Sequence, residues 1–302
     1  MPLIQYRDFN FKGEREAIIR QANDIIREYR GQGYILTLRQ LYYQFVSRDI
    51  IPNTERSYKN LGSAISDGRD AGLIDWNAIE DRGRGLSGWL IEEDEKSVLD
   101  GIEHGLGLDY WSRQDVYVEV WVEKDALSSV IERACRHRKV PYMACKGYLS
   151  ASEAWRAGQR FEANSYERCV MIHLGDHDPS GIDMTRDNEE RLQLYSQGTD
   201  IEVRRIALNM NQVEQYRPPE NPAKVTDSRA ADYISRFGTK SWELDALEPR
   251  VLEDLIEENL ADLIDDEIWE ETANEERERR QILSQFHERF DDITEFLRET
   301  GE

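Results

Sequence analysis

Cysteine, long apolar runs and basic residues are all scarce in this sequence, and each scarcity excludes a class of protein. The three cysteines, Cys135, Cys145 and Cys169, follow no spacing pattern, so we expect neither a disulfide framework nor a zinc site. No apolar stretch approaches the roughly 20 residues that a membrane-spanning helix needs, and residues 1–16 contain no apolar signal segment. We therefore expect a cytoplasmic protein without membrane association.

The shortage of basic residues argues against a simple nucleic-acid binder. Lys and Arg number 39 against 61 Asp and Glu, which gives a formal net charge of −22, and such a chain repels phosphate overall. The acidity is concentrated in residues 241–302, which hold 22 acidic and 6 basic residues, whereas residues 1–240 hold 39 and 33. This acidic segment is interpreted as a solvated helical surface, as a DNA mimic, or as a charge that repels DNA from one face.

Residues 1–84 show the pattern of a winged-helix domain. Apolar residues recur at helical spacing in Glu14–Tyr29, which predicts an amphipathic helix. Thr37 with Gln40 three positions later fits a capping box and predicts a second helix that ends near Arg48. A third helix should cover residues 55–71, and residues 73–84 should form a short strand pair. Three short helices followed by such a wing are typical of a winged-helix DNA-binding domain.

The middle of the chain alternates strands and helices. A connector (residues 85–111) precedes residues 112–240, where the alternation indicates an α/β domain with a parallel sheet covered by helices on both faces. Residues 217–224 are rich in proline and should form a loop, and residues 241–302 should form an acidic helical segment. We expect strands at Val116–Glu123, Val140–Ala144, Val170–Leu174 and Ile201–Leu208, and helices at Ile91–His104, Ala126–Arg136, Ser152–Phe161, Ile182–Tyr195, Leu247–Ile264 and Glu270–Leu297.

Three carboxylates follow two of these predicted strands. Glu123 ends the first strand, and Asp176 and Asp178 come directly after the third. Functional groups of parallel sheets gather at the carboxyl ends of the strands, and side chains at i and i+2 of an extended segment share one face. Carboxylate oxygens are the ligands that Mg²⁺ prefers, so this pattern predicts a Mg²⁺ site. The alternatives are that Glu123 pairs with Lys124 and that Asp178 caps a helix.

These residues also carry a resemblance to a known family. Val122-Glu123-Lys124, Lys146-Gly147-Tyr148 and Asp176-His177-Asp178-Pro179-Ser180-Gly181 resemble the Toprim domain shared by topoisomerases, primases and some nucleases. Upstream, Arg39-Gln40-Leu41-Tyr42-Tyr43 is similar to the tyrosine motif of one branch, with Gln40 in place of an acid. That branch contains the A subunit of topoisomerase VI and the meiotic double-strand-break protein. The resemblance covers residues 37–208, and the short chain looks like the free-standing A-subunit-like proteins of bacteria and their viruses.

The resemblance implies a DNA-cleaving activity with named residues. The second tyrosine of the motif is the nucleophile, so Tyr43 would form a 5′-phosphotyrosyl bond to DNA. Arg39 lies one helical turn before Tyr43 and would hold the phosphate. Glu123, Asp176 and Asp178 would bind Mg²⁺, and Glu123 would also be catalytic. The family further implies a homodimer in which the tyrosine of one subunit meets the metal site of the other, with a separate ATPase subunit as a possible partner. Such a protein would be nucleoid-associated or viral in a bacterial host.

Double-stranded DNA is the predicted partner, and basic residues in three places are candidates to hold it. Cations near a helix end are also ordinary partners of the helix dipole, which is the alternative for the pair around residue 137. The candidates are Arg48, Arg56, Lys59 and Arg69 in the winged helix, Arg136 and Arg138 near a helix end, and Lys124 and Lys146 in the Toprim-like motifs.

Four further positions have predictions of their own. Because successive helical residues point about 100° apart, we expect Tyr42 to be buried and Tyr43 to reach a groove. His173 should lie in the core, and His177 should orient a carboxylate or contact phosphate. Residues 242–247 should begin a helix packed on the sheet, with the alternative that they lend an acid to the metal site.

Two other functions remain open. The first is a metal-dependent Toprim nuclease in which water attacks the phosphate and Tyr43 is structural. The second is a non-enzymatic winged-helix protein that binds DNA or a partner.

Overall fold

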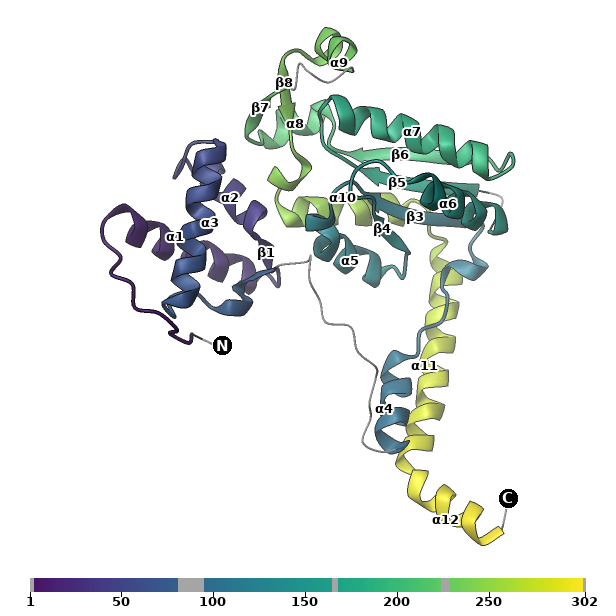
Figure 1. Ribbon diagram of the computed structural model, residues 1–302. Helices are drawn as coiled ribbons and strands as arrows, with labels where there is room; N and C mark the ends of the chain where they lie inside the picture. The colour runs from purple at the N-terminus through teal and green to yellow at the C-terminus, as the bar shows by residue number, and fades with distance from the viewer. Residues whose placement is uncertain (1–2, 81–94, 165–167, 224–228, 301–302) are drawn as a thin grey trace. The chain divides into compact units, whose positions relative to one another are not determined.

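The computed structural model describes residues 3–80, 95–164, 168–223 and 229–300, and the chain divides into two compact units. The first unit comprises Met1–Arg84 and Tyr117–Leu260, and the second comprises Gly85–Val116 and Ala261–Glu302 (Figure 1). The predicted connector thus belongs to the same unit as the end of the acidic segment. The fold is mixed α/β, as predicted.

Three helices form the N-terminal part of the first unit. They are α1 (Glu14–Gly31), α2 (Leu38–Ser47) and α3 (Glu55–Asp70), and they confirm the predicted helices to within two residues. Thr37 caps α2 in the expected capping box with Gln40. The apolar stripe of α1 is buried and packs in one core with both neighbouring helices.

The expected wing differs from the prediction in the residues that the structure describes. The short strand β2 (Ile79–Glu80) pairs in parallel with β1 (Leu36–Thr37), and a 3₁₀ turn, η1 (Trp76–Ala78), precedes it. The chain turns here because the Asp75 side chain accepts a hydrogen bond from the backbone N–H of Asn77 at 2.9 Å and is held by Arg30 at 2.7 Å. The strand pair predicted for residues 73–84 is not formed within residues 73–80. Residues 81–84 lie outside the described part.

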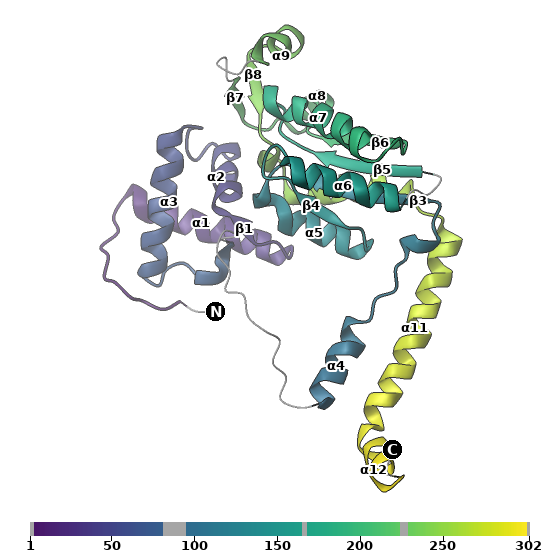
Figure 2. The ribbon, with the colours of Figure 1, turned by 45° about the vertical axis from the view of Figure 1, so that its right-hand side comes forward.

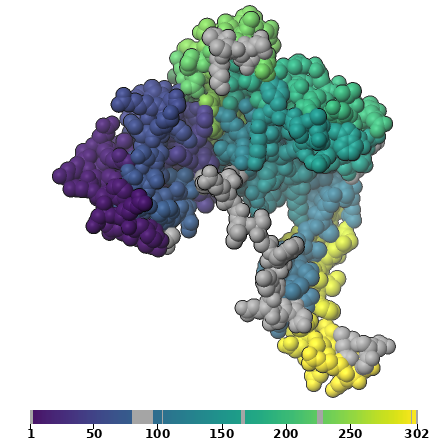
Figure 3. Space-filling view, viewed as in Figure 1, coloured from purple at the N-terminus to yellow at the C-terminus, as the bar shows by residue number. Residues whose placement is uncertain are grey.

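A four-stranded parallel sheet forms the second part of the first unit. Its strands are β3 (Val116–Val122), β4 (Tyr142–Ala144), β5 (Arg168–Leu174) and β6 (Ile201–Ala207), in the order β4-β3-β5-β6. Helices α6 (Ala151–Ala163) and α7 (Pro179–Tyr195) pack together on one face, and α5 (Ser128–His137), which follows the 3₁₀ turn η3 (Asp125–Leu127), lies on the other (Figure 2). In space-filling form the two parts of the first unit adjoin (Figure 3).

A small hairpin returns the chain to the sheet. After α8 (Met210–Tyr216), strands β7 (Glu220–Pro222) and β8 (Lys240–Trp242) pair antiparallel, with α9 (Ala230–Phe237) between them. The predicted loop at residues 217–224 therefore contains a strand. Residues 242–247 do not begin a helix as predicted: they contain the end of β8 and the 3₁₀ turn η4 (Leu244–Ala246), and α10 (Pro249–Ala261) follows.

The second unit is helical. It contains α4 (Glu95–Gly105), the 3₁₀ turn η2 (Trp111–Arg113), α11 (Asp266–Glu288) and α12 (Phe290–Thr300). The helix expected at residues 270–297 is therefore two helices, which meet at Arg289. Trp269 packs on Tyr110 and Trp111, with ring centroids 4.6 and 5.7 Å away. Among the described helices none combines the length and the apolar character that a membrane crossing requires.

Candidate functional site

The predicted carboxylates lie where the strand order of the sheet reverses. β3 and β5 are neighbours, β4 lies outside β3 and β6 lies outside β5, so the crossovers run in opposite directions on either side of this point. Ligands of open α/β sheets bind at the carboxyl ends of the strands at such a reversal. Glu123 directly follows β3, and Asp176 is the second residue after the end of β5.

Glu123 and Asp176 are in direct contact. The backbone N–H of Asp176 donates to Glu123 Oε2 at 2.8 Å. A Cβ atom at Gly175 would lie 3.0 Å from the same oxygen, so the glycine leaves room for the carboxylate. Burial raises the pKa of Glu123 above its ordinary value, and burial with the nearby Glu123 raises the pKa of Asp176 to about 8, although Lys124 opposes this. Both shifts mean that burial disfavours the charged form of these carboxyl groups, so each needs a nearby cation to stay ionised.

Asp178 serves as a helix cap. Its Oδ1 accepts a hydrogen bond from the backbone N–H of Gly181 at 2.7 Å, at the N-terminus of α7, which is the alternative that the sequence left open. Its charge still raises the pKa of Glu123, so the two carboxylates interact. Glu123, Asp176 and Asp178 thus share one edge of the sheet, but the carboxylates that approach each other most closely form a different group.

That close group consists of Asp176, Glu243 and Asp245. One oxygen from each lies within 4.8 Å of the others, and in the described part of the chain these are the only three acidic, histidine or cysteine side chains so arranged. Asp176 and Asp245 are buried. The group could hold a metal ion, because it offers several carboxylate oxygens at one point.

Lys124 lies inside this acidic group. Its Nζ is 2.9 Å from Asp176 Oδ1, 2.6 Å from Glu243 Oε2 and 3.0 Å from Asp245 Oδ1. Burial alone would lower the pKa of Lys124, but the three carboxylates outweigh it and raise the pKa above its ordinary value. In the same way, Lys124 and Arg39 outweigh burial and lower the pKa of Glu243. The lysine is therefore charged, and its ammonium is committed to these carboxylates.

The hairpin explains how Glu243 and Asp245 reach the strand ends. His177 and Trp242 exchange two backbone hydrogen bonds of 2.9 and 3.0 Å, which fasten the end of β8 beside Asp176. The backbone N–H of Leu244 then donates to Asp176 Oδ1 at 2.8 Å. Because this pairing joins distant parts of the sequence, local patterns could not predict it. The structure follows the alternative stated for residues 242–247, since Glu243 and Asp245 both join the acidic group, and their spacing at i and i+2 is the signal for it in the sequence.

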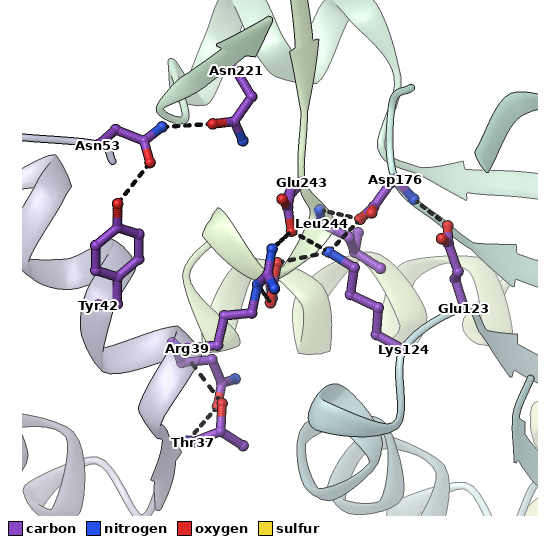
Figure 4. Close-up of polar contacts among 12 residues, drawn as sticks. Thr37, Arg39, Tyr42, Asn53, Glu123, Lys124, Asp176, Asn221, Glu243 and Leu244 are labelled. Atoms are coloured by element: carbon purple, nitrogen blue, oxygen red, sulfur yellow. Dashed lines mark hydrogen bonds and ion pairs between the residues drawn. The ribbon is translucent and has the colours of Figure 1, made fainter. Parts of the chain in front are cut away.

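The tyrosine helix α2 joins the same network. Arg39 pairs with Glu243, and its Nε lies 3.1 Å from Asp245 Oδ2. Figure 4 shows Arg39 from α2 and Lys124 from the end of β3 converging on Glu243. The guanidinium also lies over the ring of Tyr43, 5.9 Å from its centroid.

Tyr42 and Tyr43 do not divide between core and groove as predicted. Tyr42 is 5% exposed and Tyr43 is 3% exposed, yet both line one hollow of about 350 Å³, whose wall also includes Arg39, Asn53, Asn221 and Glu243. Although the two residues leave the helix about 100° apart, both rings are long enough to turn toward the same space, where their centroids are 5.4 Å apart. The Tyr42 hydroxyl donates to Asn53 Oδ1 at 2.9 Å.

Burial raises the pKa of the Tyr43 hydroxyl above its ordinary value, and the charges of Asp245 and Glu243 raise it further. Arg39 acts in the opposite direction. The tyrosine, the arginine and the acidic group therefore belong to one electrostatic environment within a single chain.

The two histidines near β5 are both buried. His173 lies in the core, as predicted, with Nδ1 2.9 Å from Thr185 Oγ1. His177 packs against Tyr233, Phe237 and Trp242, and its Nδ1 is 2.8 Å from the Tyr233 hydroxyl. Burial lowers the pKa of His173 to about 3 and that of His177 to about 4. His177 thus fixes the hairpin instead of orienting a carboxylate.

Arg205 is a site residue that the sequence analysis missed. From β6 its guanidinium donates to the backbone carbonyls of Gly175 at 2.9 Å, Asp176 at 2.7 Å and Gly181 at 3.0 Å. It is buried enough to lower its pKa to about 10, although the surrounding carboxylates oppose this. Arg205 therefore holds the loop after β5 in shape and adds a positive charge beneath the carboxylates.

Most of the predicted DNA-binding cations have protein partners. Arg56 on α3 lines a hollow of about 720 Å³ together with Lys12 and Arg15. The other seven contact carboxylates or carbonyls: Arg48 with Glu28, Lys59 with Glu55, Arg69 with the carbonyls of Trp76 and Ile79, Lys124 with the acidic group, Arg136 with Glu132, Arg138 with Glu257, and Lys146 with Asp125.

No protein-family model matches the chain, and no curated protein matches it either. The resemblance to the topoisomerase VI A-subunit family therefore rests on the motif residues alone.

Proposed function

We propose that this chain is a Mg²⁺-dependent DNA cleavage and religation protein that resembles the A subunit of a type IIB topoisomerase. The observation that carries the proposal is the ion-pair network from Arg39 through Glu243 to Lys124 and Asp176. This network brings the tyrosine helix to the carboxyl ends of β3 and β5. A nucleophile and a cation-favouring site in one place are what a phosphoryl transfer requires.

The residues at the strand ends suit Mg²⁺. Glu123, Asp176 and Asp178 would hold the ion, since hard oxygen ligands are what Mg²⁺ prefers. When bound, the ion would stabilise the negative charge that develops on the phosphate. Asp178 keeps one oxygen on the Gly181 backbone, which fixes the direction of its carboxylate.

The cleavage step uses the Tyr43 hydroxyl. Its oxygen attacks the phosphorus and forms a phosphotyrosyl ester, the bond from phosphorus to the DNA 3′ oxygen breaks, and the hydroxyl proton passes to that leaving oxygen. Because the new ester retains the energy of the broken bond, the reverse reaction religates the strand without another cofactor. Arg39 stabilises the charge on the phosphate beside Tyr43.

A hydrolytic nuclease is the second candidate, and the burial of Tyr43 favours it. A tyrosine that is 3% exposed, with a pKa raised by burial, is a poor nucleophile until the hollow around it opens. In the nuclease, water attacks the phosphate at the strand-end carboxylates, and Tyr43 only packs the core.

A denaturing gel of labelled duplex DNA incubated with the protein and Mg²⁺ separates these functions. Cleavage and religation predicts a protein–DNA adduct that Tyr43→Phe abolishes, while the matched control Tyr42→Phe retains it. Free cut ends that persist in Tyr43→Phe would establish the nuclease. DNA that is bound but not cleaved would indicate a non-enzymatic DNA-binding protein.

The proposed partners are double-stranded DNA, a second copy of the chain and, for strand passage, a separate ATPase subunit. Two copies would supply one tyrosine for each strand of a duplex and a two-fold axis that matches DNA. In the proposed dimer Tyr43 of one copy faces the strand-end carboxylates of the other. Light scattering at micromolar concentration, with and without DNA, should show a dimer, and a monomer in both conditions would remove this part of the proposal.

A further inference from the structure

Lys124 occupies the position that a metal ion would take in the acidic group. Its ammonium contacts one oxygen of each of Asp176, Glu243 and Asp245, at 2.9, 2.6 and 3.0 Å. The side chain is only 19% exposed, so water contributes little to this shell. Three carboxylate oxygens converging on one buried cation form the kind of site that otherwise binds a divalent ion.

The surroundings of the acidic group are also arranged for a cation. Asp245 is 1% exposed, and its Oδ2 accepts no hydrogen bond from the described residues, with Arg39 Nε as an ionic partner at 3.1 Å. Buried carboxylates need dedicated positive charge. Lys124 and Arg39 are the two cations that contact these three carboxyl groups, so without Lys124 the group would keep Arg39 alone.

We propose that Lys124 is the built-in cation of the Asp176–Glu243–Asp245 group, and that it takes the place of a second metal ion at the strand ends. The protein would then bind one divalent ion, on the side of Glu123 and Asp178. The assignment itself does not depend on the proposed function. Its use in DNA cleavage does: two-metal enzymes stabilise the attacking and leaving oxygens with two ions, and here a lysine would act at one of these two positions.

Divalent-ion binding tests the assignment without any assay of activity. Mn²⁺ is titrated into the full-length protein, and the bound ion is counted by electron paramagnetic resonance. We expect Lys124→Met to bind one more Mn²⁺ than the unmodified chain, because its three carboxylates lose their cation. Lys146→Met is the matched control: Lys146 is 67% exposed and pairs with a single carboxylate at 3.3 Å, so its loss should leave the count unchanged.

A second variant guards against misfolding. Lys124→Met leaves buried carboxylates facing each other, whereas Lys124→Met combined with Asp245→Asn removes one of these charges and should return the count to that of the unmodified chain. Added Mn²⁺ should also raise the melting temperature of Lys124→Met more than that of the unmodified chain, because the extra ion binds only the folded state.

Two results would contradict the assignment of Lys124, and a third would separate it from the proposed function. An unmodified chain that loses a bound Mn²⁺ in Asp245→Asn would show that a metal, and not Lys124, occupies the group. A folded Lys124→Met variant with an unchanged ion count would show that the three carboxylates are not a cation site. A chain that never cleaves DNA but gains an ion in Lys124→Met would refute the proposed function and leave this assignment intact.

Discussion

The buried acids of the sheet in the first unit and the surface acid Glu275 on α11 in the second unit are held in opposite ways. In the first unit Glu119 and Asp245 are buried, and each has dedicated cations: Arg160 holds Glu119, and Lys124 and Arg39 hold Asp245. In the second unit Glu275 is partly exposed and pairs along the surface with Arg113 and Arg279. The net charge of −22 does not separate these cases, whereas burial does.

The comparison shows which acids are candidates for chemistry. A carboxylate that water solvates costs little free energy to ionise and interacts only weakly with its neighbours, because solvent and salt screen its charge. A carboxylate that is buried among cations is strongly coupled to its surroundings, so a change in its charge is felt by every neighbour. The Asp176–Glu243–Asp245 group is of the second kind. The predictions concern either buried groups or exposed ones.

Removing Asp245 should have the largest effect. Asp245→Ala leaves Lys124 and Arg39 with fewer counter-charges in a buried site, and breaking such a pair costs about 3–5 kcal/mol. Urea unfolding followed by circular dichroism should report this loss in the free energy of unfolding. A loss below about 1 kcal/mol would mean that water already solvates the group.

Glu119 is a buried acid with a structural role, and its substitution can be compared with that of Glu123, a proposed metal ligand. Its two oxygens accept hydrogen bonds from Arg160 at 2.9 and 3.0 Å, from Tyr117 at 2.7 Å and from Trp121 at 2.8 Å, in the interior of β3. We expect Glu119→Gln to lower the free energy of unfolding by about 2–3 kcal/mol and to leave Mn²⁺ binding unchanged. Glu123→Gln, four residues on, should instead reduce Mn²⁺ binding with little loss of stability. If Glu119→Gln instead reduced Mn²⁺ binding and Glu123→Gln lowered only the stability, the metal ligand would be Glu119 and not Glu123.

Acid should weaken the first unit through His173. Burial lowers the pKa of this histidine to about 3, below its ordinary value, so the unfolded chain binds the proton first as the pH falls. The stability that the neutral histidine contributes is present above pH 6.5 and is lost as the pH falls toward 3, which amounts to about 2 kcal/mol at pH 5. Unfolding curves at pH 7 and pH 5 measure this difference, and His173→Asn should reduce it. An equal pH dependence in both proteins would exclude His173 as its source.

The surface acids of the second unit should matter least. Glu275→Gln removes two ion pairs at the surface, and solvent and salt screen such pairs so that they contribute little to stability. Thermal unfolding at low and at 0.5 M salt should show a small shift that salt removes. A loss as large as that in Asp245→Ala would erase the distinction between the two regions.

The sequence was sufficient for elements that form from local patterns. The amphipathic stripe of α1, the capping box of Thr37 and the apolar runs of β3 and β5 lie where they were expected. Each is encoded within a few residues, so neighbours in sequence determine it. Glu123 and Asp176 could be placed at one edge because parallel strands end on the same side.

The remainder of the site depends on contacts between distant segments. Glu243 and Asp245 arrive only because Trp242 pairs with His177, and Arg205 crosses from β6 to the loop after β5. No periodicity encodes such pairings. The turn at Asp75 was mispredicted because a single side-chain contact outweighs the local pattern there, and the hollow shared by Tyr42 and Tyr43 was mispredicted because both rings can turn toward it.

The residue to which DNA becomes attached is the most direct evidence for or against the proposed cleavage by Tyr43. Duplex DNA would be incubated with the protein and Mg²⁺, the reaction would be stopped with denaturant, and the adduct would be digested and mapped by tandem mass spectrometry. We predict a nucleotide on the peptide that contains Tyr43, joined through its hydroxyl to a 5′ phosphate, and no adduct when Mg²⁺ is chelated. Attachment to another residue, or cut DNA that carries no peptide, would contradict the proposed chemistry of the tyrosine helix and the strand-end carboxylates.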